Sequence, residues 1–139
     1  MWIFLNDRFV QEQDAKISVF DHGFLYGDGV YETIRSYGKR IFMRDHHLAR
    51  LHRSADAIGL TIPVPLSEWP GLLHEAMDRN RLGNDRTDAY LRITVSRGAG
   101  EIGLDPADMR PGAIRLARTL GDVDGRALEQ FHQPIDRLR

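Results

Sequence analysis

The stretch that decides the fold runs from residue 21 to residue 35 and reads Asp21-His22-Gly23-Phe24-Leu25-Tyr26-Gly27-Asp28-Gly29-Val30-Tyr31-Glu32-Thr33-Ile34-Arg35. Its first half places three glycines within seven residues, which allows close approach of the backbone or positive φ angles. Its second half leads into a run from Val30 to Tyr37 that predicts a β-strand. Gly38 and Lys39 then form a turn, so residues 40–43 are expected to pair back as a hairpin.

Polar side chains share one face of this strand and one face of a second strand expected at residues 87–96. Alternate residues of a strand point to the same side. On the first strand the polar face carries Tyr31, Thr33, Arg35 and Tyr37; on the second it carries Tyr90, Arg92 and Thr94. Such a face is either an ordinary solvated surface or the wall of a pocket for a small anion, to which arginine offers a planar fork of donors.

The remaining pattern predicts an α+β domain, a sheet with two helices packed on one face. Residues 2–5 and 8–10 are expected to form an N-terminal hairpin, and residues 17–20 a further short strand. No internal repeat interrupts this order.

Two amphipathic helices are expected between the strands. Apolar residues at steps of three and four predict a helix from Asp45, as N-cap, to Ile58, with Gly59 directly after its end. A second helix is expected after an N-cap at Ser67, with Pro70 tolerated in its first turn.

Composition and charge exclude several classes of function. The 139 residues carry a net charge of −1, which gives no general electrostatic reason to bind nucleic acid or an anionic membrane. There are no cysteines, so disulfides, zinc–thiolate sites and cysteine nucleophiles are excluded. No apolar run is long enough to span a membrane and the N-terminus lacks a signal-peptide pattern, so the protein is expected to be cytoplasmic.

Two competing motifs are weaker than they look. Residues 98–103 read G-x-G-x-x-G, the pattern of a dinucleotide-binding loop, but Pro106 and Pro111 oppose the helix that such a loop requires. His47 and His52 are five residues apart, which is not the i, i+4 spacing of paired metal ligands on a helix. Neither a Rossmann site nor a metal site is therefore expected.

Residues 21–35 resemble the signature of the class IV aminotransferases, the fold-type IV enzymes that use pyridoxal phosphate. The resemblance continues in order through residues 47–55, 90–92 and 96–106, and covers about residues 2–111. The loop at 97–106 resembles the branched-chain subgroup most. The resemblance implies transamination between a branched-chain amino acid and a 2-oxo acid, with D-amino acid aminotransferase and aminodeoxychorismate lyase as alternatives.

The resemblance also implies which residues bind cofactor and substrate. Arg50, on the first helix, matches the arginine that binds the cofactor phosphate, a contact for which a guanidinium is a strong charge-assisted donor. Substrate contacts are implied for Tyr26, Tyr31, Arg35, Tyr90 and Arg92. Thr33 stands where branched-chain enzymes often carry glycine, so the pocket is expected to differ in shape. Glu32, on the opposite face from Tyr31, is expected to be structural.

The Schiff-base lysine that transamination requires is absent from the expected place. The chain has only Lys16 and Lys39, and neither matches the catalytic position of the family, which lies in a second domain. No catalytic residue is therefore assigned. We expect that this polypeptide alone is not a competent aminotransferase, and its binding of the cofactor on its own stays open.

The domain is expected to span residues 1–111, the small N-terminal domain of such an enzyme, followed by a divergent tail at 112–139. The tail bears arginines and is poorly patterned, which indicates truncation or a frameshift near residue 111, or a genuinely short protein. The family also implies a homodimer. A catalytically silent dimerisation or binding domain is the alternative function.

Overall fold

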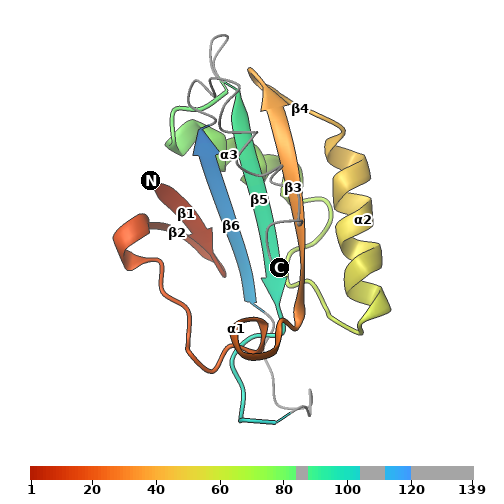
Figure 1. Ribbon diagram of the computed structural model, residues 1–139. Helices are drawn as coiled ribbons and strands as arrows, with labels where there is room; N and C mark the ends of the chain where they lie inside the picture. Colours follow the sequence, from red (N-terminus) through yellow and green to blue (C-terminus); the bar gives the residue numbers. More distant parts are fainter. Residues whose placement is uncertain (84–87, 104–111, 120–139) are drawn as a thin grey trace, which may run out of the picture.

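The computed structural model describes residues 1–83 and 88–103, and the backbone of residues 112–119. Within these residues, six strands form one antiparallel sheet in the order β2-β1-β6-β5-β3-β4 (Figure 1). The strands are β1 (Trp2–Leu5), β2 (Arg8–Gln11), β3 (Gly29–Tyr37), β4 (Arg40–Ile41), β5 (Ala89–Ser96) and β6 (Gly112–Thr119). β3 and β5 pair along almost their whole length, so the two strands with predicted polar faces lie side by side.

Two helices pack on one face of this sheet, which confirms the predicted α+β fold. α2 (Arg44–Ala57) runs beside β3, and α3 (Trp69–Arg79) lies behind β5 and β6 (Figure 1). Their buried side chains share one core with the inward residues of β3 and β5, among them Ile34, Leu48, Leu51, Trp69, Leu73, Leu91 and Ile93. No helix of the described residues is long and apolar enough to cross a membrane.

α2 begins and ends one residue earlier than predicted. Its buried residues are Leu48, Leu51 and Ala55, which the helical period places on one face. Met43, in the left-handed region at φ 46°, precedes the helix as its N-cap. Asp45 was expected to cap the helix but lies inside the first turn, where its carboxylate still complements the helix dipole. Gly59 follows the helix at φ 60°, as predicted.

α3 starts later than its predicted cap. Glu68 and not Ser67 is the N-cap, and it makes no capping bond through its side chain, while Pro70 lies in the first turn as expected. At the other end, Asn80 Oδ1 accepts from the backbone N–H of Trp2 at 2.7 Å, and Asn80 Nδ2 donates to the Trp2 carbonyl at 2.9 Å. The end of α3 is therefore joined directly to β1.

The prediction of a strand at residues 17–20 was wrong. After β2 the chain forms a 3₁₀ helix, η1 (Glu12–Asp14), and then an irregular segment. The glycine-punctuated stretch instead contains a short helix, α1 (His22–Tyr26), which Asp21 caps by accepting from the Gly23 N–H at 2.8 Å. A helix of five residues is too short to show a 3.6-residue period, so the sequence did not predict it.

The sheet extends beyond residue 111, where we expected the domain to end. β6 lies between β1 and β5 and pairs with both strands. Its sequence mixes apolar residues with arginines and predicted no strand, but a central strand satisfies its backbone N–H and C=O groups through two neighbours. The rest of the expected tail, residues 120–139, lies outside the described residues.

Candidate functional site

The two predicted polar faces form one row on the open face of the sheet, which is the face opposite α2 and α3. The facing pairs across β3 and β5 are Tyr31–Thr94, Thr33–Arg92 and Arg35–Tyr90. The row is bonded internally, since the Tyr90 hydroxyl donates to Thr33 Oγ1 at 3.2 Å. Of the residues implied by the family resemblance, Tyr31, Arg35, Tyr90 and Arg92 therefore lie together.

Within the described residues, Arg92 is the arginine of this row that has no carboxylate partner. Its guanidinium carbon lies 4.2 Å from the centroid of the Tyr31 ring, and its Nε donates to Thr94 Oγ1 at 3.3 Å. Within the described residues, Nη1 and Nη2 have no hydrogen-bond acceptor. A guanidinium held against a ring, with both terminal nitrogens open, is suited to receive a carboxylate from the open face.

Arg35 lies in the same row but is already compensated. Its Nη2 is 3.0 Å from Asp88 Oδ2, and its guanidinium carbon is 4.9 Å from the centroid of the Tyr37 ring. Both side chains of the ion pair are partly exposed, so solvent screens the attraction. Arg35 thus offers less net positive charge to an anion than Arg92 does.

Tyr26 lies on α1, at the end of the sheet and outside the row. Its ring meets the ring of the buried His22 edge-on, with the centroids 4.9 Å apart. Beside α1, a hollow of about 340 Å³ opens against β3 and β5, and its lining includes Phe24, Gly27, Gly29, Tyr31, Thr94 and Ser96. Because Tyr31 borders this hollow, the hollow adjoins one end of the polar row.

Arg50 belongs to a second cluster, which lies between β3 and α2. Its Nε donates to Glu32 Oε1 and its Nη2 donates to Glu32 Oε2 at 2.7 Å, so the two side chains form a bidentate pair. His47 Nδ1 lies 2.8 Å from the same Oε2. The Glu32 side chain is only 6% exposed, whereas that of Arg50 is 59% exposed. A buried carboxylate therefore holds an arginine whose far end reaches solvent.

The ionisation of this cluster follows from its hydrogen bonds. Donation from Arg50 above all, with a smaller part from His47, lowers the pKa of Glu32 although burial alone would raise it. The same bonds to Glu32 raise the pKa of Arg50. Glu32 is therefore ionised at neutral pH, and Arg50 stays charged.

The structure does not bring Arg50 into the open-face row. Glu32 and Tyr31 are neighbours on β3 and point to opposite faces, so the arginine bound to Glu32 starts on the helix side. In the part of the chain that is described, no contact joins Arg50 to Tyr31 or Arg92. Among the described strands, β4 pairs with the outer side of β3 only at residues 36 and 37, and the remaining edge of β3 borders α2 (Figure 1). A ligand touching both clusters would have to pass this edge.

The sequence did not predict the cluster of Glu32, His47 and Arg50. Strand alternation places Glu32 opposite Tyr31 and on the same face as Ile34, and so predicts only a structural role for it. The available signal was the acid itself, on the apolar side of a strand next to a helix with His47 and Arg50 three residues apart. A buried acid requires a partner, and both side chains are suitable partners.

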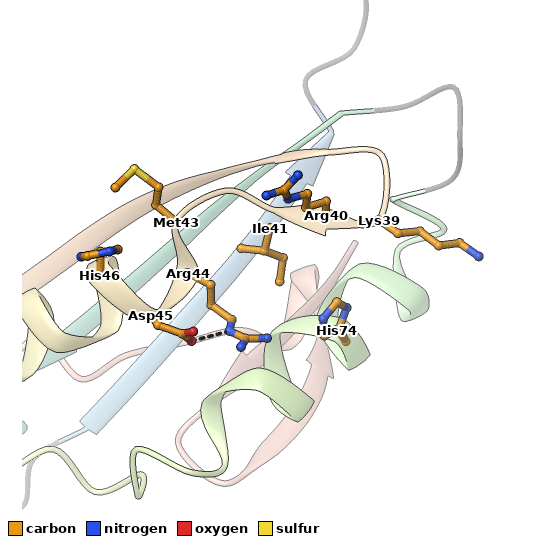
Figure 2. Close-up of a pocket in the computed structure, with 8 residues that line it drawn as sticks. All are labelled: Lys39, Arg40, Ile41, Met43, Arg44, Asp45, His46 and His74. Atoms are coloured by element: carbon orange, nitrogen blue, oxygen red, sulfur yellow. Dashed lines mark hydrogen bonds and ion pairs between the residues drawn. The ribbon is translucent and has the colours of Figure 1, made fainter.

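A second hollow, of about 390 Å³, lies away from both clusters, between the β3–β4 turn, the start of α2 and α3 (Figure 2). Basic side chains border it, but Lys39 and Arg40 extend in different directions (Figure 2). Arg44 is held by Asp45 at 2.9 Å. These donors do not converge on a common point, so we assign no ligand to this hollow.

Comparison with known proteins places this geometry in a family. Residues 29–129 match the model of "Amino-transferase class IV". A "Putative branched-chain-amino-acid aminotransferase" of Methanocaldococcus jannaschii is 48% identical over 106 residues, which are 76% of this chain and 35% of that protein. A "D-alanine aminotransferase" of Staphylococcus epidermidis is 37% identical over 97 residues, 70% of this chain and 33% of that protein.

A solved structure agrees with the fold. The branched-chain aminotransferase of Thermoproteus uzoniensis, crystallised with norvaline, superimposes with a TM-score of 0.77 at 30% identity, covering 87% of this chain and 41% of that one. The chain thus spans about a third of the length of the curated relatives it matches. A family model that covers most of the chain, with relatives and a fold that agree, leads to one conclusion: the chain belongs to the class IV aminotransferases.

Proposed function

We propose that these residues form the part of a pyridoxal-phosphate-dependent aminotransferase that binds the cofactor phosphate and the substrate. The observation that carries the proposal is Arg50, fixed along one side by Glu32 and open at its far end. Arg50 is tied to the strand residue next to Tyr31, which begins the open-face row. The activity of the whole enzyme is part of the proposal, because the chain spans only about a third of its relatives.

Arg50 fits a phosphate group. Its Nε and Nη2 are engaged by Glu32, while within the described residues Nη1 has no acceptor. A phosphate dianion can take two N–H groups of one guanidinium at once, in a short charge-assisted contact. Glu32 on one side of the guanidinium and phosphate on the other would then share the same cation.

Arg92 is the proposed partner of the substrate carboxylate. It has two open nitrogens, and the rings of Tyr31 and Tyr90 lie along the same row. Pyridoxal phosphate, when bound, supplies the aldehyde that takes up the amino group and the ring that withdraws electrons. The side chains of the row orient the substrate. Arg35 and Tyr26 are proposed to complete the rim.

The lysine is proposed to come from outside these 139 residues. Lys39 follows β3 at the end opposite Tyr31, and six strand residues span roughly 20 Å. Lys16 is exposed on the segment between η1 and α1, and no described contact joins it to the row. We therefore propose that neither amine acts on a substrate held by Arg92.

Branched-chain amino acids are the proposed substrates, and D-amino acids and aminodeoxychorismate are the alternatives. The higher identity to the Methanocaldococcus jannaschii protein than to the D-alanine aminotransferase supports the first choice. Thr33 stands where branched-chain enzymes often carry glycine, and this difference affects the shape of the proposed substrate site. Thr33 accepts a hydrogen bond from the Tyr90 hydroxyl and so fixes one wall of the row.

The cofactor site is tested by titrating the purified chain with pyridoxamine 5′-phosphate and with pyridoxamine, which differ only in the phosphate. We expect tighter binding of the phosphorylated compound, no transamination of branched-chain amino acids, and no borohydride-stable adduct with pyridoxal phosphate at a specific lysine. Equal binding of the two compounds contradicts the phosphate site. Turnover, or a stoichiometric adduct at Lys16 or Lys39, contradicts the proposal that the lysine comes from elsewhere.

A catalytically silent dimerisation domain in the cytoplasm is the second candidate. The observation that favours it is a set of exposed apolar side chains on and before α1: Ile17, Val19, Phe20, Phe24, Leu25 and Tyr26. An exposed patch of this kind marks an interaction surface. Sedimentation over a wide concentration range should show a homodimer, and a monomer at all concentrations contradicts this candidate.

A further inference from the structure

Glu32 is placed to control the orientation of the Arg50 guanidinium. The carboxylate accepts three hydrogen bonds, two from Arg50 and one from His47 Nδ1, and its side chain is almost fully buried. The strand on which it lies is paired along β5, so the carboxylate has a fixed position in the fold. Both basic side chains come from α2, one helical turn apart.

The bonds to Glu32 orient the open N–H groups of Arg50. A guanidinium is planar, and engaging its Nε and Nη2 edge leaves Nη1 and the second N–H of Nη2 directed away from the carboxylate. His47 Nδ1 lies 2.8 Å from Glu32 Oε2 and 3.3 Å from Arg50 Nη2, so the imidazole packs against the same pair. A free arginine side chain has many rotamers, and ordering it on binding has an entropic cost that this arrangement has already met.

We propose that Glu32 is a positioning residue, which fixes Arg50 so that its open N–H groups meet the phosphate of the cofactor. The inference rests on the proposed phosphate site and adds the residue that shapes it. Glu32 touches neither substrate nor cofactor, so its effect passes through Arg50.

The negative charge of Glu32, taken alone, would weaken phosphate binding, whereas its orientation of Arg50 would strengthen it. A carboxylate repels a phosphate, so replacing it by a neutral group would strengthen binding if Glu32 acted only through its charge. Solvent and salt screen this repulsion because the Arg50 end of the cluster is exposed. Loss of orientation is not screened, so we expect Glu32→Gln to weaken phosphate binding about tenfold.

A variant set on the full chain separates the two effects. Glu32→Gln keeps the shape but replaces one acceptor oxygen by an NH2 group, so it cannot accept the two parallel bonds that Arg50 makes to Oε1 and Oε2. Glu32→Asp keeps both acceptors and the charge on a shorter side chain and should recover part of the binding. Arg50→Lys keeps the charge at position 50 but removes the fork. Circular dichroism and thermal unfolding establish that each variant is folded.

The binding measurement uses pyridoxamine 5′-phosphate, with pyridoxamine as the probe lacking phosphate. Glu32→Gln should weaken the first and leave the second unchanged, and in the Arg50→Lys background it should have little further effect. If Arg50→Lys weakens binding and Glu32→Gln does not, the phosphate site stands and the positioning role falls. Stronger binding in Glu32→Gln, persisting in the Arg50→Lys background, overturns positioning in favour of repulsion. No preference for the phosphorylated probe in the unmodified chain overturns the phosphate site itself.

A spectroscopic measurement needs no cofactor. In the unmodified chain at neutral pH, the Arg50 Nε–H should give a resolved NMR resonance, because Glu32 protects it from exchange. Glu32→Gln should broaden the resonance or move it to the position of solvated arginines, and Glu32→Asp should restore it in part. An unchanged resonance in Glu32→Gln means that Glu32 does not hold Arg50, and the proposal fails whatever the binding data show.

Discussion

Arg97 donates from Nε and Nη2 to the two carboxylate oxygens of Asp28, each at 3.0 Å. The same guanidinium donates to the carbonyls of Ile58 and Gly59, at 2.8 and 2.7 Å, just after the last residue of α2. Its side chain is 12% exposed. Arg97 therefore joins the end of α2 to the start of β3, and its donors are occupied by the fold and not available to a ligand.

Replacing Arg97 by lysine should lower the free energy of unfolding by about 2 kcal/mol, because one ammonium group cannot serve a carboxylate and two carbonyls in this geometry. Urea denaturation measures the change. Glu75→Ala is the matched control: it breaks the exposed i, i+4 pair with Arg79 and should cost less than about 0.5 kcal/mol. Equal losses in the two variants would contradict the role given to Arg97.

Gly29→Ala and Gly71→Ala should act in opposite directions. A Cβ at Gly29 would lie 2.6 Å from the carbonyl oxygen of Val95, so we expect a loss of about 1–3 kcal/mol. A Cβ at Gly71 in α3 meets nothing within 4 Å, and alanine there should stabilise the helix by about 0.5–1 kcal/mol. Thermal melting decides the signs, and a neutral Gly29→Ala would show that β3 and β5 are less closely apposed than described.

Glu32 should make the stability of the chain depend on pH. Its pKa is lowered in the folded state, so the stabilisation is complete above the unfolded pKa of about 4.3 and is lost as the pH falls through the lower folded value. The free energy of unfolding should therefore fall faster below about pH 4.3 in the unmodified chain than in Glu32→Gln. Urea titrations at a series of pH values measure both curves. Parallel curves between pH 7 and pH 3 would contradict the ionised, hydrogen-bonded Glu32.

Arg92 and Arg35 should differ in their effect on a bound 2-oxo acid. Arg92→Lys removes the open fork and is expected to weaken binding of a branched-chain 2-oxo acid about tenfold. Arg35→Lys keeps a cation beside Asp88 and should change binding by less than about threefold. NMR titration of the full chain measures both constants. A larger effect at Arg35 would exchange the proposed roles of the two arginines.

The sequence predicted the open-face row because strand alternation is a strong constraint. From Val30 to Tyr37 and from Ala89 to Val95, burial alternates, and Tyr31, Arg35, Tyr90 and Arg92 share the predicted face. The helix carrying Arg50 was equally predictable from its apolar spacing, with boundaries displaced by one residue. In both cases a regular spacing of apolar residues along the chain indicates which face of the element is buried.

The features that the sequence did not predict lack a repeating pattern of apolar and polar residues. Residues 17–20 are apolar enough for a strand but lie on an exposed segment before α1 and form no strand. Whether such a segment pairs with another strand depends on the tertiary structure and not on its own sequence. β6 is fixed by its neighbours β1 and β5 and not by its own pattern. The contact between Glu32 and Arg50 joins residues 18 positions apart, and a strand–helix contact of that kind depends on how α2 sits against β3.

The central place of β6 also has a consequence for how the chain folds. The N-terminal hairpin of β1 and β2 reaches the other described strands of the sheet only through β6, whose residues come more than a hundred positions later. Such pairing has a high contact order, which slows folding. During synthesis, the edges of β1 and β5 that pair with β6 stay unpaired until residue 119 has left the ribosome. In that interval these edges can associate with other chains.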